Sequence, residues 1–211
     1  MNTPLLAFHN DSAIKAKYLA RVQAHREADQ LIQGTGWELE TSKGCAVGCT
    51  LEAYDHSRYP IELGIPVNLA YAEDHIFERL PKDLAMAWPE RFLTAIPIGA
   101  DLSLVVDKAV LWMREQDVPP DDLPAEDAAR SAELTQLFRR RIDGDEPTVE
   151  EWMTIERAAR AARAAWDAMD AWAAWDAMAA MAAMAARDAW AAFYVRLSNQ
   201  IIGLLERSGD A

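Results

Sequence analysis

Two cysteines and two histidines in the first half of the chain could together build a metal or thiol site. Cys45 and Cys49 are four residues apart, and His56 and His75 follow them. Thiolate sulfur and imidazole nitrogen are ligands of Zn²⁺, and a thiolate beside a histidine base is also a nucleophile. These four residues are therefore the candidate metal ligands and the candidate catalytic residues. The polar neighbours that could support them are Asp55, Arg58, Tyr59 and Glu73.

The spacing of these residues favours packing over chemistry. Structural zinc sites usually combine two close pairs of ligands, whereas His56 and His75 are nineteen residues apart. In the string Gly44 to Cys49, both glycines and both cysteines recur at i and i+4, so on a helix each pair would share a face. Small residues allow close approach, and a free cysteine behaves as a small buried apolar residue. We therefore expect a helix-packing seam, with a zinc or thiol site as the alternative.

No recognised catalytic motif occurs elsewhere in the chain. Di-iron bundles need a glutamate three residues before a histidine, and here those positions hold Val22, Ala53 and Ala72. The sequence also contains no His-Glu-x-x-His, no phosphate-binding loop, no dinucleotide glycine fingerprint and no Gly-x-Ser-x-Gly elbow. The sequence thus leans away from an enzyme, and it predicts no cofactor apart from zinc in the alternative.

The charge balance indicates which partners the protein can have. Asp and Glu outnumber Lys and Arg by 34 to 21, for a formal net charge of −13. Such a field repels phosphate backbones, so we expect no general nucleic-acid binding. An acidic protein without a catalytic motif is better explained by protein–protein contacts, and an oligomer is compatible with this composition.

Targeting and membrane signals are also missing from the sequence. The longest uncharged apolar run, Ala177 to Ala186, has ten residues against about 20 needed to span a bilayer. Two cysteines cannot form a disulfide framework, and the N-terminus lacks the pattern of a signal peptide. We therefore expect a cytoplasmic protein with no membrane span.

The C-terminal third is the clearest structural element of the sequence. Thr148 and Glu151 fit a capping box, and residues 148–206 hold a long alanine-rich segment with Trp or Met at nearly every third position. A three-residue step circles a helix, which predicts a central helix buried on all sides. An unbroken helix from Thr148 to Ile202 would measure about 80 Å, which is longer than a compact domain of this size, so we expect a break or kink near Arg187–Asp188 or Ser198–Asn199.

The remaining elements predict an all-α fold, a compact multi-helix bundle around the C-terminal Ala/Trp/Met-rich helix. We expect one domain over 1–211, made of N-terminal helices in 1–117, a linker, helix and turn in 118–147, and the long segment 148–206. Pro89 should stand at a helix start or a kink. The predicted shorter helices are 12–33, 64–80, 84–96, 102–113 and 125–142, with a loop over 34–43.

Several short strings together resemble a group of uncharacterised, alanine- and tryptophan-rich bacterial and phage-borne proteins. The resemblance covers most of the chain and is carried by Gly44 to Cys49, Asp55 to Tyr59, Glu62 to Pro66 and Glu73 to Glu78, ahead of the Ala/Trp-rich tail. It implies no activity and no site residues, since no function is known for the group. A phage setting favours an inhibitor or accessory protein that acts on a protein partner.

Overall fold

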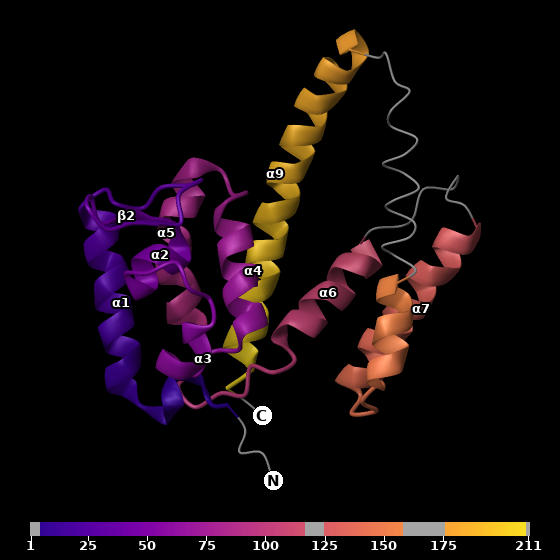
Figure 1. Cartoon of the computed structure of the whole chain (residues 1–211), viewed down its shortest axis with the longest axis horizontal. Helices are drawn as coiled ribbons and strands as arrows, with labels where there is room; N and C mark the ends of the chain where they lie inside the picture. Colours follow the sequence, from indigo (N-terminus) through magenta and orange to yellow (C-terminus); the bar gives the residue numbers. More distant parts are fainter. Residues whose placement is uncertain (1–4, 117–124, 158–175, 210–211) are drawn as a thin grey trace. The chain divides into compact units, whose positions relative to one another are not determined.

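The computed structural model describes residues 5–116, 125–157 and 176–209 (Figure 1). These residues are mostly helical, which confirms the predicted helical fold class at this level. No helix among them is long and apolar enough to cross a membrane. The chain divides into two compact units, residues 1–106 with 187–211, and residues 107–186.

The first unit is built around one helix, α5. Its elements are η1 (Ala7–Asn10), α1 (Ser12–Glu27), β1 (Trp37–Glu38), β2 (Lys43–Gly44), α2 (Ala46–Leu51), α3 (Arg58–Glu62), α4 (Val67–Phe77), α5 (Lys82–Ala95) and the part of α9 (Asp176–Arg207) from residue 187 on. Helix α5 contacts α1, α2 and α4. Its fully buried Trp88 and Phe92 lie 5.7 Å apart between ring centres and form the core with Tyr18, Tyr59 and Phe77.

Helix α1 begins where the sequence predicts and ends earlier. The Asp11 side chain accepts a hydrogen bond from the backbone N–H of Ala13 at 2.8 Å, which satisfies one of the free donors of the first turn. The helix ends at Glu27, and Asp29 adopts a positive φ of 56°. Leu31, which we expected on the helix, instead forms a β-bridge with Gly44.

The predicted loop over 34–43 contains a small antiparallel pair of strands. β1 and β2 pair Trp37 with Gly44, and Gly44 and Gly48 lie directly against the Gly36 backbone. A Cβ added to Gly44 would stand 2.5 Å from the Gly36 carbonyl oxygen, and one added to Gly48 only 1.9 Å from it. The predicted close packing by small residues is therefore present, but against this hairpin rather than against a second helix.

Helix α2 is shorter than the predicted seam requires. It spans Ala46–Leu51, and Cys45 is its N-cap residue with extended backbone angles. Cys45 and Cys49 therefore do not share one helical face. The interpretation that both glycines and both cysteines of this string lie on one helix is wrong. The reason is that Gly44 is held in the β2 ladder, which delays the start of the helix by two residues.

Helix α4 lies within its predicted range, α5 begins two residues before its predicted start, and Pro89 is not at a helix start. It lies inside α5, where it is buried next to Trp88. A proline in a helix interior removes one backbone hydrogen bond, so the prediction placed it at a start or a kink. Burial of this face against neighbouring helices offsets that loss.

The described end of α9 is buried along one stripe. Tyr194, Leu197, Ile201 and Leu205 are at most 7% exposed, while Ala192, Arg196, Asn199 and Glu206 are exposed. From residue 191 on, α9 is therefore amphipathic rather than buried on all sides, and α5 has the central place that we expected for α9. Helix α9 runs unbroken through both predicted break points, Arg187–Asp188 and Ser198–Asn199. Residues 158–175 of the predicted segment lie outside the described residues.

The second unit contains α6 (Val105–Gln116) from residue 107 on, α7 (Ala125–Ile142), helical residues 149–157 and the first part of α9. Helix α7 has the predicted bounds. The predicted capping box is also confirmed, because Glu151 accepts the Thr148 N–H at 2.7 Å and donates its own N–H to the Thr148 hydroxyl at 3.3 Å. The Arg114 guanidinium donates to the Ser131 carbonyl at 2.7 Å and joins α6 to α7.

Candidate functional site

Cys45 is fixed in place by the glycine-rich backbone around it. Its N–H donates to the Gly36 carbonyl at 3.1 Å, and its Sγ accepts the N–H of Gly48 at 3.5 Å. The residue is 1% exposed. The sulfur is therefore held at the start of α2 in one position, facing helix α4.

Helix α4 brings two carboxylates to that sulfur. Asp74 and Glu78 are one turn apart, and a ligand atom from each lies within 4.8 Å of the other and of Cys45 Sγ. The Glu78 carboxylate accepts the backbone N–H of Gly34 at 2.6 Å, which ties it to the loop before β1. We refer to these three residues as the Cys45–Asp74–Glu78 cluster.

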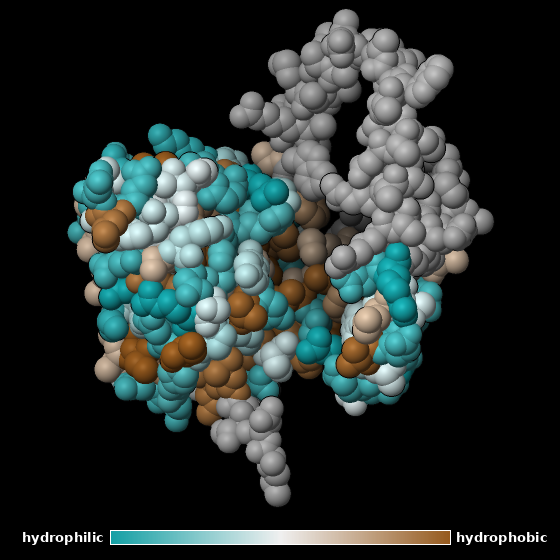
Figure 2. All heavy atoms as spheres, in the orientation of Figure 1, coloured by the Kyte–Doolittle hydropathy of each residue, from teal (hydrophilic) through white to brown (hydrophobic). Residues whose placement is uncertain are grey.

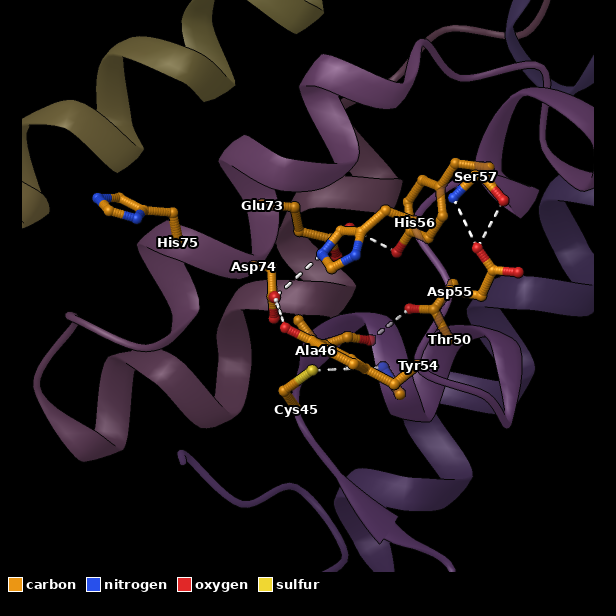
Figure 3. A network of polar contacts seen from close by, with 12 residues as sticks. Cys45, Ala46, Thr50, Tyr54, Asp55, His56, Ser57, Glu73, Asp74 and His75 are labelled. Carbon is orange, nitrogen blue, oxygen red and sulfur yellow. Dashed lines mark hydrogen bonds and ion pairs between the residues drawn. The ribbon is translucent and has the colours of Figure 1, made fainter. Parts of the chain in front are cut away.

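Two aromatic side chains from the α2–α3 loop hold Asp74. His56 Nε2 and the Tyr54 hydroxyl both donate to Asp74 Oδ2, each at 3.0 Å (Figure 3). The His56 ring is stacked on Tyr71, with ring centres 4.2 Å apart and planes 14° from parallel. The other carboxylate oxygen, Asp74 Oδ1, is buried and has no hydrogen-bond partner among the described residues. One acceptor in a residue only 8% exposed is thus left without a donor.

The electrostatics of the cluster disfavour a reactive thiol. Burial, and next the carboxylate of Asp74, raise the pKa of Cys45 well above its ordinary value. Burial, followed by Asp74, raises the pKa of Tyr54 to about 12. Burial likewise raises the pKa of Glu78. A nucleophilic cysteine needs a lowered pKa, so the thiol-enzyme alternative finds no support here. A cation among these groups would lower all three pKa values.

Glu73 is buried next to the cluster and faces a different set of partners. It is fully buried, and its Oε2 accepts the Tyr59 hydroxyl at 2.6 Å, while Trp88 Nε1 donates to its backbone carbonyl at 3.0 Å. Glu73 Oε1 has no partner among the described residues. Burial raises the pKa of Glu73 to about 8. At neutral pH this side chain is therefore mainly the protonated acid.

The structure brings together only two of the four residues that the sequence singled out. Cys45 and His56 meet through Asp74. Cys49 Sγ instead donates to the Gly44 carbonyl at 3.4 Å, and burial raises its pKa to about 12. His75 points away from the cluster and is within 3.0 Å of the Tyr194 hydroxyl on α9 (Figure 3). Cys49 and His75 are therefore not ligands of a common site with Cys45.

The predicted supporting residues mostly have other partners. Asp55 accepts bonds from Ser57, Arg58 pairs with Glu62, and Tyr59 and Glu73 bond each other. Tyr54, Asp74 and Glu78 were not among the predicted ligands, although Asp74 and Glu78 lie on a helix that the sequence predicts. The usable signal was the spacing of Asp74 and Glu78, which puts both carboxylates on one face of a predicted helix.

The chain matches no protein-family profile, no curated protein and no solved structure. The resemblance to bacterial and phage-borne proteins therefore stays a prediction.

Proposed function

We propose that the protein binds a divalent metal ion of the Zn²⁺ type at the Cys45–Asp74–Glu78 cluster. The observation that carries the proposal is the convergence of one thiol and two carboxylates within 4.8 Å, with the buried oxygen Asp74 Oδ1 left without a hydrogen-bond donor. Sulfur and carboxylate oxygen together suit a borderline ion such as Zn²⁺ better than Mg²⁺. Ligands of one Zn²⁺ lie about 3.5 Å apart, which small side-chain rotations would achieve.

The surroundings of the cluster support a bound cation. Asp74 and Glu78 converge in a partly buried site, so each carboxylate makes ionisation of the other less favourable, and a bound cation would remove that penalty. His56 and Tyr54 would act as outer partners that orient Asp74, in the way metal-binding carboxylates are commonly held. Three protein ligands leave a fourth position for water, and bound Zn²⁺ makes such a water acidic.

Cobalt titration tests this proposal directly. Protein purified without a metal-affinity step is expected to bind one Co²⁺ and to show sulfur-to-cobalt charge-transfer absorption. Cys45→Ser should abolish that absorption, and Cys49→Ser is the matched control that should retain it. Asp74→Asn and Glu78→Gln should each weaken binding by about 10-fold or more. Absorption that is lost in Cys49→Ser but kept in Cys45→Ser would overturn the assignment.

Thiol accessibility gives a second readout on the same two residues. Zn²⁺ should slow the reaction of Cys45 with a thiol reagent under mildly denaturing conditions, because a coordinated thiolate is withheld from the reagent. The rate for Cys49, measured in the Cys45→Ser variant, should not depend on Zn²⁺. Equal Zn²⁺ protection of both cysteines would contradict the proposed ligand set.

Protein binding is a second candidate function, favoured by exposed apolar side chains near this site. Ile61, Val67 and Tyr71 are 74%, 39% and 58% exposed, and the last two lie one turn apart on α4. On the face of the first unit shown in Figure 2, single hydrophobic residues are interspersed in a mostly hydrophilic surface. With a net charge of −13, the partner would carry basic groups. Partner capture by two variants tests this candidate. The double variant Val67→Ser with Tyr71→Ser should lose the partner, and the control variant Leu39→Ser should keep it.

A further inference from the structure

A cavity of about 380 Å³ lies between the loop after α1, strand β2 and the start of α5. Its walls include the apolar side chains of Leu31, Ile32 and Met86. Lys43 from β2 and Lys82 from α5 line it as well, and Asp29 and Gln33 complete the lining. The cavity shares no residue with the Cys45–Asp74–Glu78 cluster.

The side chains of these two lysines have no hydrogen-bond or ion-pair partner among the residues that the structure describes. Within residues 5–116, 125–157 and 176–209, the Nζ atoms of Lys43 and Lys82 form no hydrogen bond and no ion pair, and Lys17 and Lys108 are alike in this respect. Most described arginines, by contrast, pair with a carboxylate, as Arg26 does with Glu90. In a chain with 34 acidic and 21 basic residues, the lining of this cavity is unusual because two lysines outnumber its one acidic residue, Asp29, and leave a net positive charge.

The framework of the cavity is fixed rather than loose. Gln33 donates its amide to the carbonyls of Phe77 at 2.7 Å and Leu80 at 2.9 Å, which anchors the loop to the end of α4. The Ile32 N–H donates to the Gly44 carbonyl at 2.9 Å, which anchors the same loop to β2. Met86 follows Lys82 by one helical turn, so both side chains lie on one face of α5.

We infer that this cavity binds a small organic anion, with its charged group between Lys43 and Lys82 and its apolar body against Leu31, Ile32 and Met86. The anionic group of such a ligand would make a charge-assisted contact with each lysine, and its apolar ring would be buried against the apolar side chains. A ligand with only one of these two parts would make only one of the two kinds of contact. The start of α5 adds a positive helix end on the same side, although Asp83 in its first turn partly offsets it.

Calorimetric titration with phenyl phosphate tests the inference, with inorganic phosphate and phenol as probes of the two halves. The titrations contain a chelator, so that the result does not depend on metal at the other site. Phenyl phosphate should bind saturably and at least about 10-fold more tightly than either half alone. No saturable binding up to about 10 mM, or equal affinity for inorganic phosphate, would overturn the inference.

Variants of the two lysines locate the binding. Lys43→Gln with Lys82→Gln should weaken phenyl phosphate binding by about 10-fold or more, whereas Lys108→Gln, an exposed lysine of α6, should not change it. The double change Lys43→Arg with Lys82→Arg keeps both charges and should retain most of the affinity, which separates lost charge from lost folding. Unchanged binding in the double glutamine variant would place the anion elsewhere and refute the assignment.

Discussion

Glu73 makes the stability of the metal-free protein depend on pH. Its pKa of about 8 in the folded state exceeds the ordinary 4.5, so between these values the folded protein keeps a proton that the unfolded chain loses. This contribution to stability is therefore full below pH 4.5 and is lost as the pH rises toward 8. Glu73→Gln mimics the protonated acid, so this variant should not show the decrease in the free energy of unfolding, on the order of 3 kcal/mol, that the wild type shows as the pH rises.

Urea unfolding with a chelator at pH 5 and pH 9 measures this effect. The wild type should lose more stability between the two pH values than Glu73→Gln does. Glu40→Gln, which changes an exposed glutamate, serves as the control and should follow the wild type. Parallel pH dependence in the wild type and Glu73→Gln would show that Glu73 does not hold the proton.

Gly48 and Gly203 are two helical glycines with opposite expectations. A Cβ at Gly48 would meet the Gly36 carbonyl oxygen at 1.9 Å, whereas one at Gly203 would meet only the flexible guanidinium of Arg207 at 3.1 Å. Gly48→Ala should therefore lower the free energy of unfolding by about 2 to 3 kcal/mol. Gly203→Ala should raise it by about 0.5 to 1 kcal/mol because alanine favours helix. Chemical denaturation of both variants checks the pair, and a neutral Gly48→Ala would contradict the close packing.

The candidate site shows which of its residues could be identified from the sequence and which could not. Ligand chemistry pointed to Cys45 and His56, because sulfur and imidazole are rare and recognisable. Asp74 and Glu78 were harder to select, since acidic residues make up a large share of this chain and most of them are solvated. Only the fold determines which carboxylates converge on a buried sulfur.

Capping is the clearest determinant of the helices at the scale of elements. Asp11 accepts the Ala13 N–H at the start of α1. Asp11→Ala should lower the free energy of unfolding by about 1 kcal/mol, and Asp11→Asn, which keeps the acceptor, should lose much less. Thermal unfolding of the two variants measures the difference. An equal loss in both would assign the effect to charge rather than to the cap.

Local signals predicted the elements that depend on local interactions. The Thr148 capping box and the bounds of α7 follow from side chains within a few residues. The end of α1 and the β1–β2 pair depend on distant partners, because Leu31 leaves the helix to bridge Gly44. Pro89 stays inside α5 for the same reason, since tertiary burial outweighs a local preference.

At the scale of the whole chain, composition predicts the class of the fold but not the arrangement of its helices. Mean charge and alanine content indicated an acidic helical protein, and the helical class is confirmed. Composition does not predict which helix lies at the centre. Helix α5 is central because it contacts α1, α2 and α4, and its own helix propensity does not determine these contacts. The described end of α9 is half solvated for the same reason: its partners cover one stripe only.

At the scale of the whole molecule, a bound metal should stabilise the fold that assembles the site. The cluster joins the start of α2 to α4, and Glu78 also holds the Gly34 loop, so unfolding would separate all its members. A ligand that binds only the folded state stabilises it by about 2.7 kcal/mol at 100 times its Kd. Zn²⁺ should therefore raise the thermal midpoint of the wild type and of Cys49→Ser, but not that of Cys45→Ser.

The net charge of −13 makes a control with other cations necessary. Any salt screens the mutual repulsion of the acidic groups and can stabilise the fold without a site. Screening acts equally on Cys45→Ser and Cys49→Ser, since neither change alters the net charge, and it should be reproduced by Mg²⁺ at equal ionic strength. A Zn²⁺ effect that survives in Cys45→Ser, or that Mg²⁺ matches in full, would be screening and would remove the support for a specific site. A shift that requires both Zn²⁺ and the Cys45 sulfur, and that Mg²⁺ does not reproduce, is the result expected from coordination, because net charge and ionic strength are the same in the two cysteine variants.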